Sequence, residues 1–273
     1  AIDNSFVAQM LNGIDEFYTA QGYQIIIMQS KESYPQELAC IDLLYAGGID
    51  GLLISPSYQT TDFEYLNELQ VAGLPIVLFD RLSDGIDTHK VAADHFMGAY
   101  DATTHLIKRG FKAIAHINSD TQLHMATARF EGYKKALIDA GLTIRNELIK
   151  FVDTTSLPDL TKNLGTVIEE LMTLPQKPEA IFTATDSIST KCMVVLKQLK
   201  YSVPEDIALI GFSNTELADA LYTPLSTINQ PAFEIGRLAA EKLLSLIKSK
   251  VPEPFETILL ATELQERDST IKR

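Results

Sequence analysis

The chain has 273 residues, of which 46% are hydrophobic and 22% are charged, so it carries enough apolar material for a folded core and is not disordered throughout. Its 36 Asp and Glu residues outnumber 23 Lys and Arg residues, for a formal net charge of −13, which disfavours binding to the phosphates of DNA or RNA. No apolar run approaches the ~18 residues that cross a bilayer, so we expect no membrane partner. The length is about that of two domains.

The first residues predict a helix. Favoured N-cap residues stand near the start, at Asp3, Asn4 and Ser5. Apolar residues then recur at helical spacing, at Phe6, Met10, Ile14 and Phe17. Ala1 is not an initiator methionine and no signal segment follows it, so we expect a fragment whose preceding strand is missing.

Beyond this helix, short β-branched runs alternate with longer amphipathic stretches. Strands are predicted at Gln24–Met28, Gly51–Ser55, Pro75–Phe79, Ala113–Ile117, Ile149–Val152, Ala180–Ala184 and Ile207–Gly211. Helices are predicted at Pro35–Ala46, Asp62–Ala72, Asp94–Lys108, Ala126–Ala140, Leu157–Leu174 and Ser187–Leu199. This alternation predicts an α/β fold with parallel sheets covered on both faces. There are too many strands for one compact sheet, so we expect two lobes joined by several short crossings.

Polar residues follow most of the predicted strands. They occur at 55–57, 80–81, 118–120, 153–155, 185–187 and 213–214. Ligands of open parallel sheets bind at the carboxyl ends of the strands, and these carboxylates, hydroxyls and amides suit a hydroxylated neutral ligand better than a phosphate. The same residue types also cap helices, and for each single residue that alternative stays open.

The motifs of common enzymes are absent from the sequence. It contains no G-x-S-x-G elbow, no phosphate-binding P-loop and no G-x-G-x-x-G turn, and its five histidines show no zinc-ligand spacing. We therefore expect neither an enzyme nor a cofactor or metal. Cys40 and Cys192 are far apart in sequence, and buried thiols in a reducing cytoplasm are a simpler interpretation than a disulfide.

Several stretches of the sequence together match one known family. They are PEDIALIGF at 204–212, TPLSTINQP at 223–231, GRLAA at 236–240, DGLLI at 50–54, PIVLFDR at 75–81, RFEGY at 129–133, and the terminal Glu263-Leu264, Arg267 and Ser269-Thr270. The chain resembles the effector-binding core of lactose-repressor (LacI/GalR) family transcription regulators. The resemblance implies a two-lobed periplasmic-binding-protein-like fold, each lobe being a parallel sheet flanked by helices. Mapped onto this chain, the first lobe holds residues 1–110 and 230–251 and the second holds 111–229 and 252–273.

The resemblance also implies partners. The family works as a cytoplasmic homodimer, binds a small effector between its lobes, and contacts operator DNA through an N-terminal helix-turn-helix domain that this chain lacks. A sugar is the expected effector. Surplus apolar positions in the helices predicted at 35–46 and 62–72 suggest the dimer interface, with cover over the sheet as the alternative, and these are Leu38, Ile41, Leu66 and Leu69.

Effector contacts carry over by position. Phe6 matches an aromatic that stacks on the ligand, Arg129 matches the pocket arginine, and Asp94 matches a polar residue facing the ligand. Leu123 and Met125 replace the polar contacts of a purine binder. The full set of predicted ligand-binding residues is Asn4, Ser5, Phe6, Asp94, Leu123, Met125, Arg129, Asp153, Thr185, Ser213 and Asn214.

One alternative function shares the fold. An extracytoplasmic sugar-binding protein of an uptake system has the same two lobes. The segment at 204–207 and the chain's C-terminal pattern favour the regulator.

Overall fold

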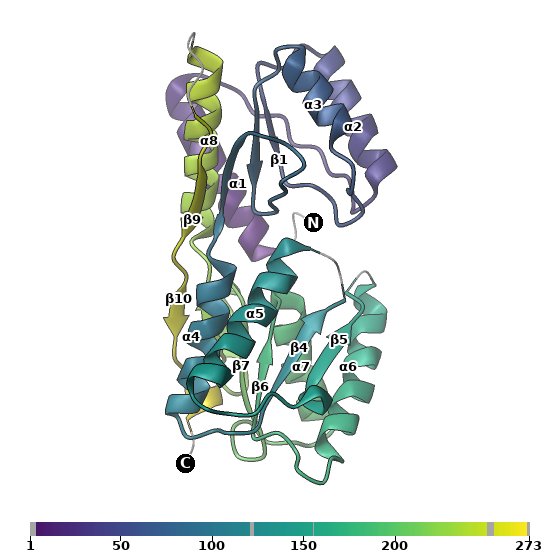
Figure 1. Ribbon diagram of the computed structural model, residues 1–273, viewed down its shortest axis with the longest axis vertical. Coiled ribbons are helices and arrows are strands. Elements are labelled where there is room, and N and C mark those ends of the chain that lie inside the picture. Colours follow the sequence, from purple (N-terminus) through teal and green to yellow (C-terminus); the bar gives the residue numbers. More distant parts are fainter. Residues whose placement is uncertain (1–3, 121–122, 155, 250–253, 272–273) are drawn as a thin grey trace. The chain divides into compact units, whose positions relative to one another are not determined.

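A computed structural model describes residues 4–120, 123–154, 156–249 and 254–271, and its chain divides into two compact units (Figure 1). The first unit consists of residues 1–93 and 231–260, and the second of residues 94–230 and 261–273. Each unit is a mainly parallel sheet flanked by helices, which confirms the predicted α/β class and two-lobed architecture.

The borders of the units differ from the predicted ones. The first crossing falls after Ala93, and not at 110, because the following helix packs against a helix of the second unit. The last crossing falls after Leu260, because the strand that ends there pairs with a strand of the first unit. The border predicted at 251–252 lies outside the described residues.

The first unit has a four-stranded sheet of order β1-β2-β3-β9, with every pair parallel. Its helices are α1 (Ser5–Gln21), α2 (Tyr34–Ala46), α3 (Glu64–Val71) and α8 (Ala232–Lys248). Its strands are β1 (Leu52–Ile54), β2 (Ile76–Phe79), β3 (His89–Ala93) and β9 (Thr257–Leu260). Helices α1 and α8 pack together through two glycines, because a Cβ at Gly13 or Gly236 would collide with the backbone of the other helix.

The predicted strand at Gln24–Met28 is wrong. This segment is in no strand of the described sheet, and Ile26 is 69% exposed. An apolar groove of about 690 Å³ is lined by this segment, by β1 and by residues of α1 such as Met10 and Ile14. The β-branched residues favour an extended backbone, but a strand also requires a hydrogen-bonded neighbour.

Three of the four residues predicted for the dimer interface lie in the core. Ile41, Leu66 and Leu69 are buried beside Ile76 and Leu78 of β2, and Leu38 is half-buried. Ile41, Leu66 and Leu69 therefore cover the sheet, and the dimer contact through these helices stays a prediction.

The second unit has a six-stranded sheet of order β10-β8-β7-β6-β4-β5, in which only the β10–β8 pair is antiparallel. Its strands are β4 (Ile114–Ser119), β5 (Ile149–Val152), β6 (Ala180–Thr183), β7 (Ala208–Phe212), β8 (Ser226–Asn229) and β10 (Glu263–Gln265). Its helices are α4 (His95–Lys108), α5 (His124–Asp139), α6 (Leu157–Met172) and α7 (Asp186–Gln198), with 3-10 turns at Asn146–Leu148, Ala218–Ala220 and Asp268–Thr270.

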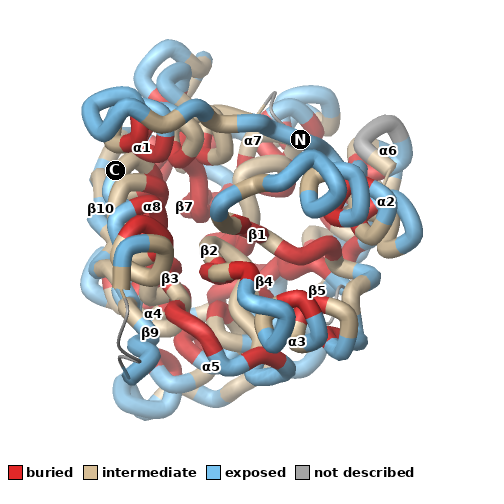
Figure 2. Tube along the Cα trace, turned by 90° about the horizontal axis from the view of Figure 1, so that it is seen from above, coloured by how far each residue is buried: buried red, intermediate tan, exposed pale blue. Residues whose placement is uncertain are grey.

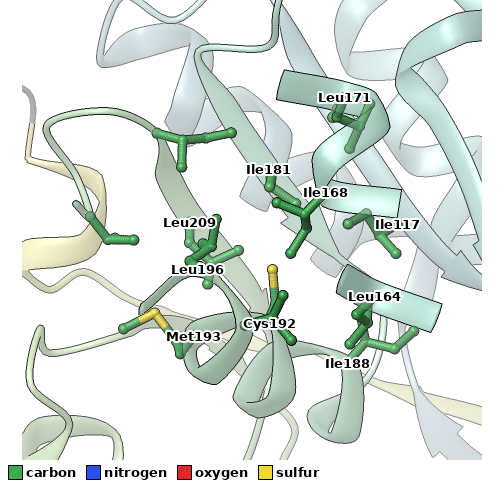
Figure 3. Packing of buried hydrophobic residues seen from close by; sticks show 14 of the residues in the cluster. Ile117, Leu164, Ile168, Leu171, Ile181, Ile188, Cys192, Met193, Leu196 and Leu209 are labelled. Carbon is green, nitrogen blue, oxygen red and sulfur yellow. The ribbon is translucent and has the colours of Figure 1, made fainter. Parts of the chain in front are cut away.

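Both faces of this second sheet are buried. Along β6, Ala180 and Phe182 face the cluster formed with α4 and α5, whereas Ile181 faces the cluster formed with α6 and α7. Figure 3 shows the latter cluster, in which Cys192 packs among aliphatic side chains. Burial of this kind on alternate sides explains the continuous apolar strands of the sequence. Most residues of β1 to β4 and of β6 to β8 are buried, whereas β5, β9 and β10 are more exposed (Figure 2).

Both cysteines are buried free thiols, as the simpler interpretation predicted. Cys40 lies on α2 of the first unit and Cys192 on α7 of the second. Burial raises the pKa of the Cys192 thiol to about 12, so this thiol stays protonated and unreactive.

Candidate functional site

The candidate site lies at the carboxyl ends of the parallel strands of the second unit. There β6 is followed by Thr185, β7 by Ser213 and Asn214, and β8 by Gln230. Ser213 is 1% exposed, and its hydroxyl donates to the Asp186 carboxylate. The structure thus brings the three predicted residues of these loops to one edge of the sheet.

Arg129 is the centre of this site. It is 4% exposed, Nη1 donates to the Ala184 carbonyl, and Nη2 donates to Gln230 Oε1 at 3.0 Å. Nη2 also lies 3.1 Å from His95 Nδ1, and the guanidinium carbon lies 3.9 Å from the centre of the Phe212 ring. Arg129 is therefore not part of a surface ion pair, which is the commonest role of an exposed arginine.

The local sequence of α5 explains why Arg129 points inward. Ala126, Arg129, Tyr133 and Ala136 are all buried and recur at helical spacing, so they form the inner stripe of the helix. Gly132 lies on the same side, against the backbone of Phe96 at the start of α4, which lets the two helices approach closely. Arg129 is therefore held beside His95, one residue before Phe96.

Gln230 is a site residue that sequence reasoning missed. Asn214 Nδ2 donates to the Gln230 carbonyl at 2.7 Å, and the Gln230 backbone N–H donates to Asn214 Oδ1 at 3.0 Å. These two bonds fix the position of Gln230, whose side-chain oxygen accepts a hydrogen bond from Arg129. The signal was available, because Gln230 follows a strand in the same way as Ser213 does, but β8 was not predicted.

The site contains one buried cation, Arg129, together with neutral polar groups and the Asp186 carboxylate, which accepts a hydrogen bond from Ser213. Burial holds the pKa of His95 well below its usual value, and the neighbouring Arg129 and His124 lower it further. Burial raises the pKa of Asp186, and the bond from Ser213 offsets part of this rise. The arrangement can donate hydrogen bonds to a polyol and accept hydrogen bonds from it.

The other predicted residues of this unit are more peripheral. Asp94 caps α4 by accepting from the Met97 N–H at 2.9 Å, and Thr185 caps α7 by accepting from the Ile188 N–H at 3.3 Å. Leu123 stands just before α5, Met125 is half-buried within it, and Asp153 is exposed after β5. In this structure Asp94 and Thr185 therefore act as helix caps, which is the alternative that the sequence left open.

The first unit holds the remaining predicted residues. Asn4 caps α1 by accepting from the Phe6 N–H at 2.8 Å, and Ser5 is the first helical residue. Phe6 is 8% exposed and packs among Met10 and other core residues. Packing therefore accounts for Phe6, and its stacking on a ligand stays a prediction.

A second polar cluster lies at the carboxyl ends of β1 and β2 in the first unit. Arg81 donates to both carboxylate oxygens of Glu32, at 2.6 and 2.8 Å, and to the Pro56 carbonyl at 3.0 Å. Burial raises the pKa of Glu32, but the bonds from Arg81 outweigh it and leave the pKa below its ordinary value. Ser55 donates to Asp80 at 3.4 Å. Both loops belong to the polar positions noted in the sequence.

Among the residues that the structure describes, no helix is both long and apolar enough to cross a bilayer. No group of three or more His, Cys, Asp or Glu side chains in the same residues is placed to hold a metal ion.

Comparison with known proteins identifies the family and the fold. Residues 103–270 match the periplasmic binding protein-like domain family. The chain is 28% identical over 270 residues to catabolite control protein A of Priestia megaterium, covering 98% of this chain and 79% of that protein. It is 29% identical over 274 residues to the HTH-type transcriptional repressor PurR of Vibrio atlanticus (strain LGP32), covering 98% and 78%. A solved complex of the transcriptional regulator CelR with cellobiose superposes with a TM-score of 0.84 at 25% identity, covering 97% of this chain and 79% of that one.

The family match spans well over half of the chain, and the relatives named above are transcription regulators aligned along nearly all of it. The chain therefore belongs to the periplasmic binding protein-like family, as an effector-binding core of the LacI/GalR type.

Proposed function

We propose that this chain is the effector-sensing and dimerisation domain of a bacterial transcription regulator that binds a sugar. The observation that carries the proposal is the buried Arg129, which donates to the Ala184 carbonyl after β6 and to the Gln230 side-chain amide after β8, at the edge of the sheet where Ser213 also lies. A buried cation among neutral hydrogen-bonding groups recognises an oxygen-rich ligand. Regulation would run from this ligand to operator DNA through a helix-turn-helix domain, in the cytoplasm.

The chemistry of the site favours a sugar over a purine. Leu123 and Met125 offer apolar surface at the start of α5, where a purine ring would need polar partners for its ring nitrogens. Hydroxyls, in contrast, both donate and accept, as Asn214, Ser213 and Gln230 do. The relative named CelR was solved with cellobiose, and this supports the same class of ligand here.

The test is a binding screen on the whole chain. D-ribose, D-glucose and cellobiose are compared with hypoxanthine and inorganic phosphate by thermal shift, and each hit is titrated by calorimetry. We expect a sugar to raise the melting temperature, since a ligand at 100 times its Kd adds about 2.7 kcal/mol to the free energy of unfolding. Stabilisation by hypoxanthine alone would overturn the proposed ligand class.

Dimerisation rests on a separate observation. Ile26, Ile27 and Met28 are consecutive large apolar residues that are 69%, 47% and 38% exposed. Contiguous exposed apolar side chains are uncommon on monomers and mark interaction surfaces. We place the contact with a second copy of the chain at this segment, and not at the core-facing residues of α2 and α3.

A further inference from the structure

Arg129 shares a hydrogen bond with a histidine on a different helix. His95 is the first residue of α4 and is 6% exposed, and its Nδ1 lies 3.1 Å from Arg129 Nη2. A guanidinium can only donate, so His95 Nδ1 is the acceptor of this bond. The imidazole is therefore neutral, with its proton on Nε2.

The surroundings of His95 stabilise this neutral form. Burial lowers its pKa, and Arg129 and His124, both on α5, lower it further. Phe212 contributes an aromatic ring with its centre 6.2 Å away. A protonated imidazole would lose the acceptor and place a second positive charge beside the guanidinium.

Two acceptors then define the orientation of the guanidinium. Gln230 Oε1 and His95 Nδ1 together occupy both hydrogens of Nη2, at 3.0 and 3.1 Å. One acceptor comes from the start of α4 and the other from the loop after β8. With the plane also held over the Phe212 ring at 3.9 Å, the direction of the remaining N–H groups is fixed.

The other nitrogen of His95 carries the remaining proton of the neutral ring. Nε2 is buried and has no hydrogen-bond partner among the residues that the structure describes. A donor left unpaired in the interior is unfavourable and rare in a closed core. An oxygen of a bound polyol is the kind of group that would satisfy it.

We propose that His95 is a positioning residue of the effector site, which fixes the orientation of Arg129 by accepting one Nη2 hydrogen through Nδ1. This inference rests on the proposed function, because it assigns the fixed guanidinium to the sugar. His95 and the Gln230 side chain then have the same role, because each accepts one hydrogen of Arg129 Nη2.

The first test needs no ligand and no variant. Nitrogen-15 NMR of the full chain is expected to show a neutral His95 ring protonated on Nε2, and Arg129 Nη2 hydrogens in slow rotation about the Cζ–Nη2 bond. A ring protonated on Nδ1, or freely rotating Nη2 hydrogens, would overturn the proposal.

Two variants then separate positioning from a structural role. His95→Phe keeps a planar ring without an acceptor and should release the Nη2 hydrogens, whereas His95→Gln offers an amide oxygen and should keep them ordered. The matched control is His105→Phe on the same helix, a buried histidine whose Nε2 lies 2.8 Å from Thr270 Oγ1. It should lower stability and leave the Arg129 signals as in the wild type. Wild-type signals in His95→Phe would contradict the proposal.

Binding of D-ribose and cellobiose, measured by calorimetry, links the pair to the effector. The sugar that binds the wild type should bind His95→Phe about tenfold more weakly, equivalent to about 1.4 kcal/mol, and His95→Gln nearly as tightly as the wild type. Equal affinity in His95→Phe would overturn the positioning role and leave the proposed function standing. If neither sugar binds the wild type, the proposed function is in error for these sugars, and the NMR signals alone decide the role of His95.

Discussion

Asn214 and Gln230 are joined by two hydrogen bonds that run in opposite directions. The Asn214 side-chain amide donates to the Gln230 carbonyl at 2.7 Å, and the Gln230 N–H donates back to Asn214 Oδ1 at 3.0 Å. Both residues are buried. The pair therefore ties the loop after β7 to the loop after β8, and it holds Gln230 where its side chain meets Arg129.

Replacing Asn214 by Asp should destabilise the second unit. The carboxylate cannot donate to the Gln230 carbonyl, so two acceptor oxygens would face each other in the interior. We expect a loss of about 1–3 kcal/mol in the free energy of unfolding, measured by urea denaturation. Asn67→Asp is the control, because Asn67 donates a single exposed bond to the Gly85 carbonyl at 3.0 Å. Equal losses in the two variants would contradict the role of the Asn214 pair.

Replacing Arg129 by Lys should impair both stability and sugar binding. An ammonium keeps the charge but cannot reach the Ala184 carbonyl, Gln230 and His95 together as the planar fork does. Loss of buried bonds from a charged donor should cost about 1.5–3 kcal/mol of stability. The measurements are urea denaturation and calorimetry with the sugar identified in the screen.

Arg237→Lys is the matched control for that variant. Arg237 lies on α8 and forms exposed ion pairs with Glu234 and Glu241, which contribute little to stability. Its substitution should change neither the unfolding midpoint nor the sugar affinity. An Arg129→Lys variant that behaved in the same way would remove Arg129 from the site.

His116 should make the protein less stable in acid. It is fully buried, it stacks on Tyr133 and Phe182, and burial lowers its pKa to about 3. Between this value and an unfolded pKa of about 6.5, the unfolded chain binds a proton that the folded chain does not, so the free energy of unfolding falls as pH falls, by up to about 1.4 kcal/mol per pH unit.

The check is urea denaturation at pH 7, 6 and 5. His116→Phe should make the fall in stability shallower by up to about 1.4 kcal/mol per pH unit. If His116→Phe kept the slope of the wild type, another group would be responsible for acid sensitivity.

Dimerisation should depend on the exposed apolar segment at 26–28. Ile26→Lys introduces a charge at the most exposed of its three side chains, and burying that charge against a second copy is unfavourable. Sedimentation velocity at micromolar concentration should show a dimer for the wild type and a monomer for the variant. Ile138→Lys on α5 is the control, since Ile138 is 58% exposed and belongs to the second unit. A monomeric wild type, or an equal effect of both variants, would contradict the proposed interface.

Local periodicity in the sequence determined most of the elements, whereas the inward position of Arg129 was expected only from the family resemblance. The order of strands and helices in the second unit follows from apolar runs and caps that span a few residues each, and the observed ends differ from those predicted by one or two residues in most of them. The polar character of the loops that end the strands is also visible in the sequence. These features are local, because each depends on side chains within one or two turns of the backbone.

The tertiary structure alone decided which residues complete the site and which extended segments pair. Arg129 meets Gln230 across 101 residues of sequence and His95 across 34, and no periodicity links such positions. Gln24–Met28 has strand composition but belongs to no strand, whereas His89–Ala93, with a histidine and a lysine, forms β3 because it lies between β2 and β9. A hydrogen bond needs both partners, and here the second partner comes from a distant part of the chain, so only the folded arrangement supplies it.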